Sequence, residues 1–136
     1  MSGGLCFPLY ACSGEIIKRY TPFLEKIDLT YTQYIAMMVL WGKKQISVKE
    51  LGKCLFLDSG TLTPLLKKLE QKGYVTRTRS EEDERVLIAA ITPKGEDLKD
   101  EAVLIPQKMM ACAALPQEKA AQLYTLLYEL LNTLEK

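Results

Sequence analysis

The sequence contains no histidine. Catalytic triads of Ser, His and Asp, histidine general bases and zinc sites that use imidazole are therefore excluded. The four cysteines stand alone at positions 6, 12, 54 and 112, with no Cys-x-x-Cys pair, so a metal site built from thiolates is not expected. We accordingly expect no metal and no other cofactor.

Long apolar runs are missing as well. No stretch approaches the roughly 18 apolar residues of a membrane-spanning helix, and the first residues lack the basic and apolar regions of a secretory signal. We therefore expect no membrane association, a cytoplasmic location, and cysteines that are thiols in a reducing compartment. The length of 136 residues fits a single domain over 1–136.

The net charge of +1 conceals an uneven distribution. Between Lys43 and Arg79 there are nine Lys and Arg against three Asp and Glu, a local charge of +6, so the rest of the chain carries −5. A basic block between acidic flanks favours an anionic partner such as nucleic acid. A solvated charged surface is the alternative at this point.

Apolar residues at helical spacing and capping signals predict several helices. They are expected over about 5–20, 30–42, 47–55 and 59–72, from Thr92 onward with a kink or break at Pro106, and from Leu115-Pro116 to about 134. Thr21-Pro22 should interrupt the first helix. Capping boxes at 30–33 and 47–50 should open the second and third, and Gly42 should end the second.

After Gly73 the apolar period changes from 3.6 to 2. Residues 74–79 and 86–91 read as two strands of a β-hairpin whose tip is the charged segment 80–85. Helix, short helix, turn, helix and hairpin is the plan of a winged helix-turn-helix, a mainly α fold with a small β-hairpin wing.

The winged helix should cover about 30–92. The segments 1–29 and 93–136 carry more apolar surface than so small a domain can cover, so we expect the N- and C-terminal helices to form a homodimer.

The helix over 59–72 is the candidate for reading double-stranded DNA. Small hydroxyl and basic side chains, suited to base edges and phosphates in the major groove, lie on faces that its leucines leave free. These side chains are Ser59, Thr61, Thr63, Lys67 and Lys68. Asp58 and Gly60 are better explained as a cap and a close-approach position. Arg77 and Arg79 alternate along the next strand and should contact phosphates.

Two sets of residues resemble known regulators. The segments FLDSGTLTPLLKKLE at 56–70 and RTRSEEDER at 77–85 resemble the MarR family. The segment LCFPLY at 5–10, with Tyr20, Thr30-Tyr31 and Gln33-Tyr34, is similar to the organic hydroperoxide resistance regulators of that family. This resemblance implies a homodimeric repressor that leaves an inverted-repeat operator when an organic hydroperoxide oxidises an N-terminal cysteine.

The resemblance also assigns roles to residues of the wing. Arg85 matches an arginine that enters the minor groove, where a narrow A·T-rich groove attracts a guanidinium. Asp83 should pair with Arg85 or a neighbouring basic residue and fix its direction. An exposed ion pair of little energetic value is the alternative for this pair.

The sensor predicted from the resemblance is centred on Cys6. A thiolate near the start of the first helix is stabilised by free N–H groups and the helix dipole, and Tyr20 and Tyr31 can donate hydrogen bonds to the sulfur. Tyr10, one turn after Cys6, should complete the pocket wall. Cys112 is similar in position to the resolving cysteine of the two-cysteine regulators. Cys12 and Cys54 are expected in the core.

Two other functions remain open on the sequence. A regulator of the same fold could be released from DNA by a small aromatic or phenolic ligand, with Cys6 merely lining the pocket. A thiol peroxidase using Cys6 and Cys112 would not need a winged helix, and no catalytic arginine is evident near Cys6, so an enzyme is not expected.

Overall fold

The computed structural model describes residues 4–112 and 115–134, without the side chains of residues 109–112. Contacts divide the chain into two compact units that meet between Ile105 and Pro106. The first unit contains α1 (Cys6–Glu25), α2 (Tyr31–Lys43), β1 (Gln45–Ser47), α3 (Val48–Leu55), α4 (Ser59–Gln71), β2 (Val75–Arg79), β3 (Leu87–Ile91) and α5 (Pro93–Ala102). α6 (Ile105–Cys112) begins at the boundary, and α7 (Gln117–Leu134) lies in the second unit.

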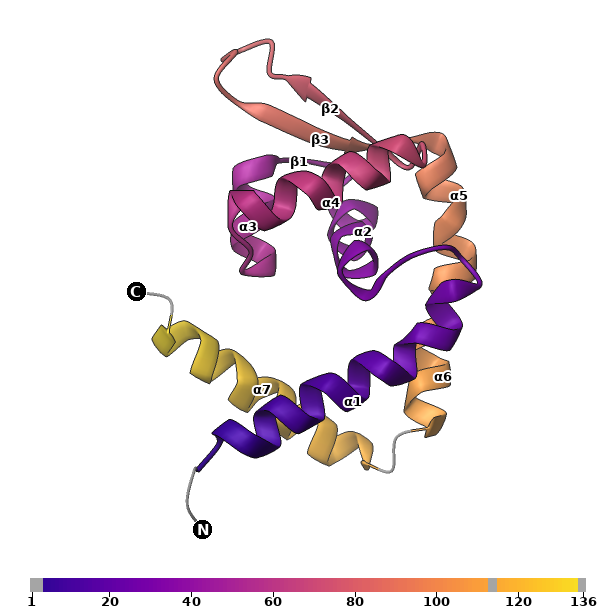
Figure 1. Ribbon diagram of the computed structural model, residues 1–136, viewed down its shortest axis with the longest axis vertical. Helices are drawn as coiled ribbons and strands as arrows, with labels where there is room; N and C mark the ends of the chain where they lie inside the picture. Colours follow the sequence, from indigo (N-terminus) through magenta and orange to yellow (C-terminus); the bar gives the residue numbers. More distant parts are fainter. Residues whose placement is uncertain (1–3, 113–114, 135–136) are drawn as a thin grey trace. The chain divides into compact units, whose positions relative to one another are not determined.

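In the first unit α2 is the central helix, in contact with α3, α4, α5 and the sheet (Figure 1). Large side chains that are almost fully buried form the core: Leu24, Met37, Leu40, Leu51, Leu62, Leu66, Leu69 and Val75. Trp41 of α2 closes one side of it by donating an indole hydrogen bond to the carbonyl of Gly95 in α5, at 2.8 Å. The predicted winged helix-turn-helix is confirmed.

The wing is a three-stranded antiparallel sheet with the order β1-β3-β2 rather than a simple hairpin. β2 and β3 confirm the two predicted strands, and Arg77 lies opposite Ala89 in their register. β1 was missed because three residues between two helices are too few to show an alternating pattern. It pairs Ile46 with Ala89, which brings an apolar side chain into the core.

Most predicted helix starts are confirmed by their caps. Thr30 and Gln33 form the complete capping box of α2, and Asp58 caps α4. Thr92 caps α5, with Pro93 as its first residue. Ser47 caps α3 by accepting from the Glu50 N–H, which is one half of the predicted box. The break near Pro106 is confirmed, since α5 ends at Ala102 and α6 begins at Ile105.

Two predicted helix ends are wrong. α1 continues through Pro22 to Glu25, and its burial of Leu24 in the core stabilises this last turn. Pro22 has no N–H to donate to the carbonyl four residues earlier, and water can bind that carbonyl instead. α2 ends not at Gly42 but one residue later, and Lys44 adopts the positive φ of 70°. Tertiary contacts hold Lys44 there, since its carbonyl accepts from the N–H of Ile91.

Among the described residues, no helix is both long and apolar enough to cross a membrane.

Candidate nucleic-acid interface and cysteine sensor

α4 has one apolar and one polar face. Its leucines are buried, and the five predicted DNA-reading residues, Ser59, Thr61, Thr63, Lys67 and Lys68, are all exposed. Asp58 fixes the start of the helix by accepting from the N–H of Thr61 at 2.8 Å. Hydrogen bonds from Thr61 also hold the pKa of Asp58 below its ordinary value, so this carboxylate is a cap.

The tip of the wing carries the predicted arginine. The Arg85 side chain is 90% exposed, and its Nε and Nη2 donate to the two carboxylate oxygens of Asp83 at 3.1 and 3.2 Å. The Arg85 backbone N–H donates to the same carboxylate, and these bonds lower the pKa of Asp83. The predicted pairing is therefore confirmed, and it fixes the direction of the guanidinium.

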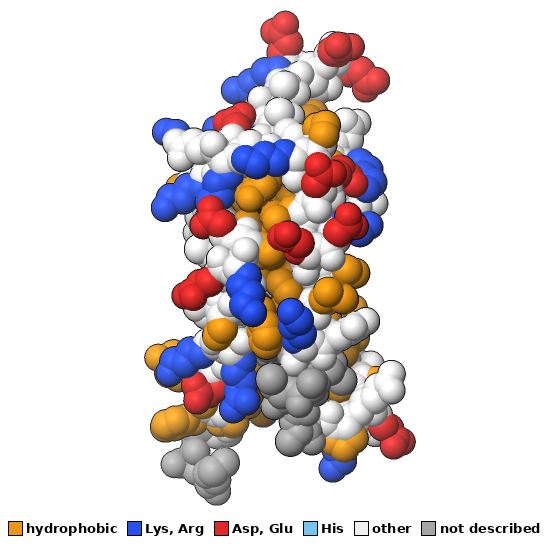
Figure 2. All heavy atoms as spheres, turned by 90° about the vertical axis from the view of Figure 1, so that its right-hand side faces the viewer, with side chains coloured by type: hydrophobic (Ala, Val, Ile, Leu, Met, Phe, Trp, Pro, Cys, Tyr) orange, Lys and Arg blue, Asp and Glu red, His pale blue; other side chains and the backbone are white. Residues whose placement is uncertain are grey.

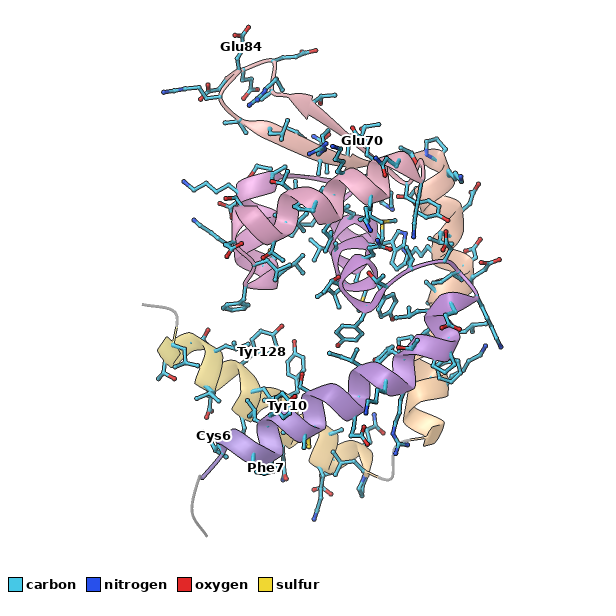
Figure 3. All side chains as sticks on the ribbon, viewed as in Figure 1. Cys6, Phe7, Tyr10, Glu70, Glu84 and Tyr128 are labelled. Carbon is cyan, nitrogen blue, oxygen red and sulfur yellow. The ribbon has the colours of Figure 1, made fainter. Side chains whose placement is uncertain are left out.

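Acidic side chains crowd the end of the molecule that carries the wing tip, with basic side chains behind them (Figure 2). Glu84 points away from the body of the protein at this tip (Figure 3). The phosphate backbone repels such carboxylates, so at the tip only Arg85 offers a charge suited to DNA.

The two strand arginines differ in their surroundings. Arg79 is exposed at the end of β2. Arg77 is bound to Glu70 of α4, with Nη2 and Nε donating to the same oxygen at 3.0 and 3.3 Å, and its side chain is only 20% exposed. Phosphate contact by either residue stays a prediction, but the geometry suits Arg79 and opposes Arg77.

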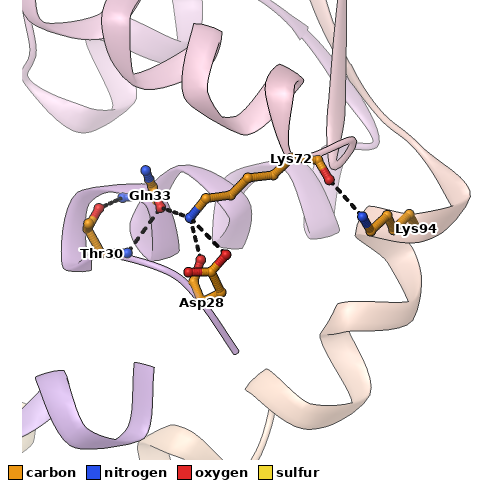
Figure 4. A network of polar contacts seen from close by, with 5 residues as sticks. All are labelled: Asp28, Thr30, Gln33, Lys72 and Lys94. Atoms are coloured by element: carbon orange, nitrogen blue, oxygen red, sulfur yellow. Dashed lines mark hydrogen bonds and ion pairs between the residues drawn. The ribbon is translucent and has the colours of Figure 1, made fainter. Parts of the chain in front are cut away.

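A polar network that the sequence did not reveal fixes the other end of α4 (Figure 4). Nζ of Lys72 donates to the carbonyl of Asp28 and to Oε1 of the buried Gln33, and it lies 3.6 Å from the Asp28 carboxylate. Oε1 of Gln33 also accepts from the N–H of Thr30. Lys94 donates to the carbonyl of Lys72. The loop between α1 and α2 is thereby tied to the end of α4.

Cys6 is the first residue of α1 and is exposed. Its neighbours Phe7 and Tyr10 are exposed too, by 77% and 82%, and all three lie at the free end of the helix (Figure 3). Tyr10 lines an open hollow on α1 with residues such as Ala11, Gly14 and Lys18, and Cys6 is not among the lining residues. The role of Tyr10 beside Cys6 stays a prediction.

Tyr20 and Tyr31 are brought together, as an edge-to-face pair with ring centroids 5.2 Å apart. Tyr34, which was not predicted as a sensor residue, packs on Tyr20 at 5.8 Å. Burial, and then the neighbouring phenols, raise the pKa of Tyr34 to about 12, and burial also raises the pKa of Tyr20. These two phenols are therefore protonated hydrogen-bond donors at neutral pH.

The predicted sensor residues fall into two groups within one chain. Cys6 and Tyr20 are 14 residues apart on one continuous helix, which is about 21 Å along its axis. The phenol of Tyr20 thus cannot reach the Cys6 sulfur of its own chain. Cys112 is the last residue of α6, and its side chain is outside the described part of the structure.

The predicted core positions of Cys12 and Cys54 are wrong, since both thiols are exposed. α1 has apolar residues at helical spacing, but its residues 6–19 are all exposed. In α3 the buried residues are Leu51 and Gly52, so Cys54 falls on the solvent side.

Residues 18–102 match the family of SarA/Rot transcriptional regulators. The chain is 48% identical over 132 residues to the organic hydroperoxide resistance transcriptional regulator of Bacillus subtilis (strain 168). These matched residues cover 97% of this chain and 90% of that protein. The chain belongs to the SarA/Rot family.

The chain is also similar to two other proteins. The regulator SarZ of Staphylococcus saprophyticus is 57% identical over 96 residues, 71% of this chain and 66% of SarZ. Reduced AbfR bound to DNA has a TM-score of 0.82 and 31% identity, over 97% of this chain and 92% of AbfR. AbfR comes from Staphylococcus epidermidis.

AbfR has also been seen in two oxidised states. Overoxidised AbfR bound to DNA has a TM-score of 0.79 and 32% identity, over 97% of this chain and 92% of AbfR. Disulfide-containing AbfR has a TM-score of 0.66 and 31% identity, over 96% of this chain and 87% of AbfR. The resemblance to hydroperoxide-responsive regulators is confirmed, and this SarA/Rot-family chain is a transcriptional regulator and not an enzyme.

Proposed function

We propose that the chain is a cytoplasmic, homodimeric repressor that leaves its operator when an organic hydroperoxide oxidises Cys6. The observation that carries the proposal is the placement of Cys6: an exposed thiol begins a helix whose residues 6–19 are all exposed. The paired rings of Tyr20 and Tyr31 lie near the other end of the same helix.

A homodimer completes the sensor. A twofold axis that sets two copies of α1 side by side and antiparallel places Cys6 of one chain near Tyr20 and Tyr31 of the partner subunit. This arrangement supplies the hydrogen-bond donors that the chain's own helix keeps about 21 Å from the sulfur. It also covers apolar residues such as Leu5 and Phe7, which are 65% and 77% exposed.

The same dimer presents two DNA-reading helices to an inverted-repeat operator, about one helical turn apart. The hydroxyls of Ser59, Thr61 and Thr63 lie at the start of α4, where they suit base edges. Lys67, Lys68 and Arg79 supply phosphate contacts. Arg85, aimed by Asp83, enters the minor groove.

Release follows from cysteine chemistry. The Cys6 thiolate attacks the peroxide oxygen, which gives a sulfenic acid and an alcohol. The thiol of Cys112 of the partner subunit then condenses with the sulfenic acid, so that a disulfide forms and water leaves. The disulfide-containing state of the relative AbfR supports the disulfide step. Because the bond shifts α1 or α6, the spacing of the two DNA-reading helices changes.

The deciding experiment is a gel shift with and without cumene hydroperoxide, with a non-reducing denaturing gel of the same samples. The duplex is one selected by the reduced protein from a random pool. We expect release from DNA together with a band of twice the monomer mass. Oxidised protein that runs only as a monomer contradicts the intersubunit disulfide.

Substitutions separate the sensor from its alternatives. Cys6→Ser should stay bound under peroxide, whereas a ligand-gated regulator would not depend on this thiol. Cys112→Ser should oxidise at Cys6 yet form no dimer band. Cys54→Ser, which removes another exposed thiol, is the matched control and should behave like the wild type. Tyr20→Phe and Tyr31→Phe should slow oxidation while leaving reduced-state DNA affinity intact.

A further inference from the structure

The turn between α4 and β2 brings a carboxylate of the DNA-reading helix onto the wing. Gly73 adopts a positive φ of 85°, and the N–H groups of Gly73 and Tyr74 bond back to the last turn of α4. The chain therefore reverses tightly. Glu70, in that last turn, lies beside the middle of β2 (Figure 3).

Three hydrogen bonds join Glu70 to a single residue. Nη2 and Nε of Arg77 donate to Oε1 at 3.0 and 3.3 Å, and the backbone N–H of Arg77 donates to Oε2 at 3.2 Å. β2 is an edge strand of the sheet, so this N–H faces away from β3 and needs another acceptor. Glu70 thus binds the side chain and the backbone of the wing together.

Glu70 is an ionised carboxylate at neutral pH. Hydrogen bonds from Arg77 hold the pKa of Glu70 below its ordinary value. The side chains are 38% and 20% exposed, so the pair is partly shielded from solvent, unlike Asp83–Arg85 at the tip. A half-shielded pair with fork geometry restricts orientation better than a fully exposed one.

We propose that Glu70–Arg77 is a brace that holds the wing at a fixed angle to α4, so that Arg77 serves DNA binding by positioning Arg85 and not by contacting phosphate. Groove contacts by α4 and by the wing tip must occur together on one duplex, and a wing that is free to swing would have to be ordered on binding. The inference rests on the DNA binding proposed above.

The brace and a phosphate contact predict opposite effects of Glu70→Gln on DNA affinity. If Arg77 contacts phosphate, Glu70 competes with DNA for its guanidinium, and Glu70→Gln should tighten binding. If the pair is a brace, Glu70→Gln should weaken binding by between about threefold and tenfold, even though the substitution removes a negative charge near DNA. The melting temperature of each variant confirms that the fold is intact.

The salt dependence of affinity supplies a second readout. Affinity falls as salt rises, and the loss of one phosphate contact reduces the magnitude of the slope of log K against log salt by about 0.9. We expect that decrease for Arg79→Gln, the matched control on the same strand, and no such decrease for Arg77→Gln. The double variant Glu70→Gln/Arg77→Gln should bind no more weakly than either single variant, because both remove one interaction.

The third readout tests whether Glu70 affects DNA binding through Arg85. In an Arg85→Ala background, Glu70→Gln should change affinity less than twofold, since there is no wing-tip arginine left to position. Binding is measured by fluorescence anisotropy with the selected duplex. A Glu70→Gln variant that binds as tightly as wild type or more tightly overturns the brace, as does an Arg77→Gln slope that falls as far as that of Arg79→Gln. If the reduced wild type itself shows no salt-dependent binding, the proposed function fails, and the brace with it.

Discussion

At the scale of single residues, Asp83 and Arg85 form an ion pair where such a pair adds little to stability. The arginine side chain is 90% exposed, and solvent screens the attraction between exposed charges. Three hydrogen bonds converge on one carboxylate nevertheless. The pair therefore restricts the direction of the Arg85 guanidinium, which we propose to contact DNA.

Removing Arg85 tests this directly. Arg85→Ala should weaken operator binding by roughly 1–3 kcal/mol, because the minor-groove contact is lost, and should leave the melting temperature unchanged. Glu84→Ala, at the neighbouring tip position, is the control and should not weaken binding. Unaltered affinity of Arg85→Ala, measured by fluorescence anisotropy, would remove the wing tip from the DNA interface.

Tyr34 gives a pH-dependent prediction at the same scale. Its pKa is about 12 in the folded protein and about 10 in an unfolded chain, so the folded state holds the proton more tightly. The stability contributed by Tyr34 is complete below pH 10 and is lost as pH rises from 10 to 12. Urea unfolding across this range should show a shallower decline for Tyr34→Phe than for wild type. Tyr10→Phe, at an exposed position, should retain the wild-type decline.

At the scale of elements, α5 packs so closely on the wing that its third residue must be glycine. A Cβ on Gly95 would collide with the Tyr74 carbonyl and lie 2.9 Å from Cγ1 of Ile91. The Gly95 carbonyl accepts from Trp41, and its N–H donates to the Thr92 cap. Backbone atoms on both sides leave little room for relaxation.

Two alanine substitutions in helices should therefore act in opposite directions. Gly95→Ala should destabilise the protein by roughly 1–3 kcal/mol through overpacking. Gly42→Ala, in an exposed position of α2 with no atom within 4 Å of the new Cβ, should stabilise it by about 0.5–1 kcal/mol. Chemical denaturation of both variants measures the difference. A Gly95→Ala protein as stable as wild type would mean that α5 can move away from the sheet.

At the scale of the whole molecule, apolar surface is concentrated on the terminal helices. None of the described side chains of α7 is buried, and Tyr124 and Tyr128 stack on each other at 4.8 Å while still 65% and 46% exposed. Leucines such as Leu127 continue this surface. So much exposed apolar surface is characteristic of an interface, and this supports the proposed homodimer.

A charge placed in this surface should separate the proposed dimer. Leu127→Glu should be monomeric at micromolar concentration, because a carboxylate would have to be buried without a partner. It should also bind an inverted-repeat duplex more weakly, since two linked half-sites become independent. Asn132→Glu adds the same charge on the polar stripe of α7 and should remain dimeric. Light scattering distinguishes the two, and a dimeric Leu127→Glu protein would place the interface elsewhere.

Features whose energetics are local could be predicted from the sequence. The caps Thr30–Gln33, Asp58 and Thr92-Pro93 act within four residues, so their signals are visible in short segments. In the same way, the alternating period identified the strands of the wing, and the leucine spacing of α4 identified its exposed polar face. The Asp83–Arg85 pair also spans only two residues.

Contacts between groups on different elements depend on the packing of those elements and could not be predicted from the sequence. The pairs Glu70–Arg77 and Lys72–Asp28, the packing of Tyr34 on Tyr20, and the third strand β1 all join segments whose approach depends on how the helices pack. Exposure of Cys12 and Cys54 likewise reflects which helix faces find a neighbour, and helical spacing alone does not contain that information. An apolar pattern indicates that a helix face can be buried, but burial requires a partner surface. That surface comes from elsewhere in the chain or from a second copy.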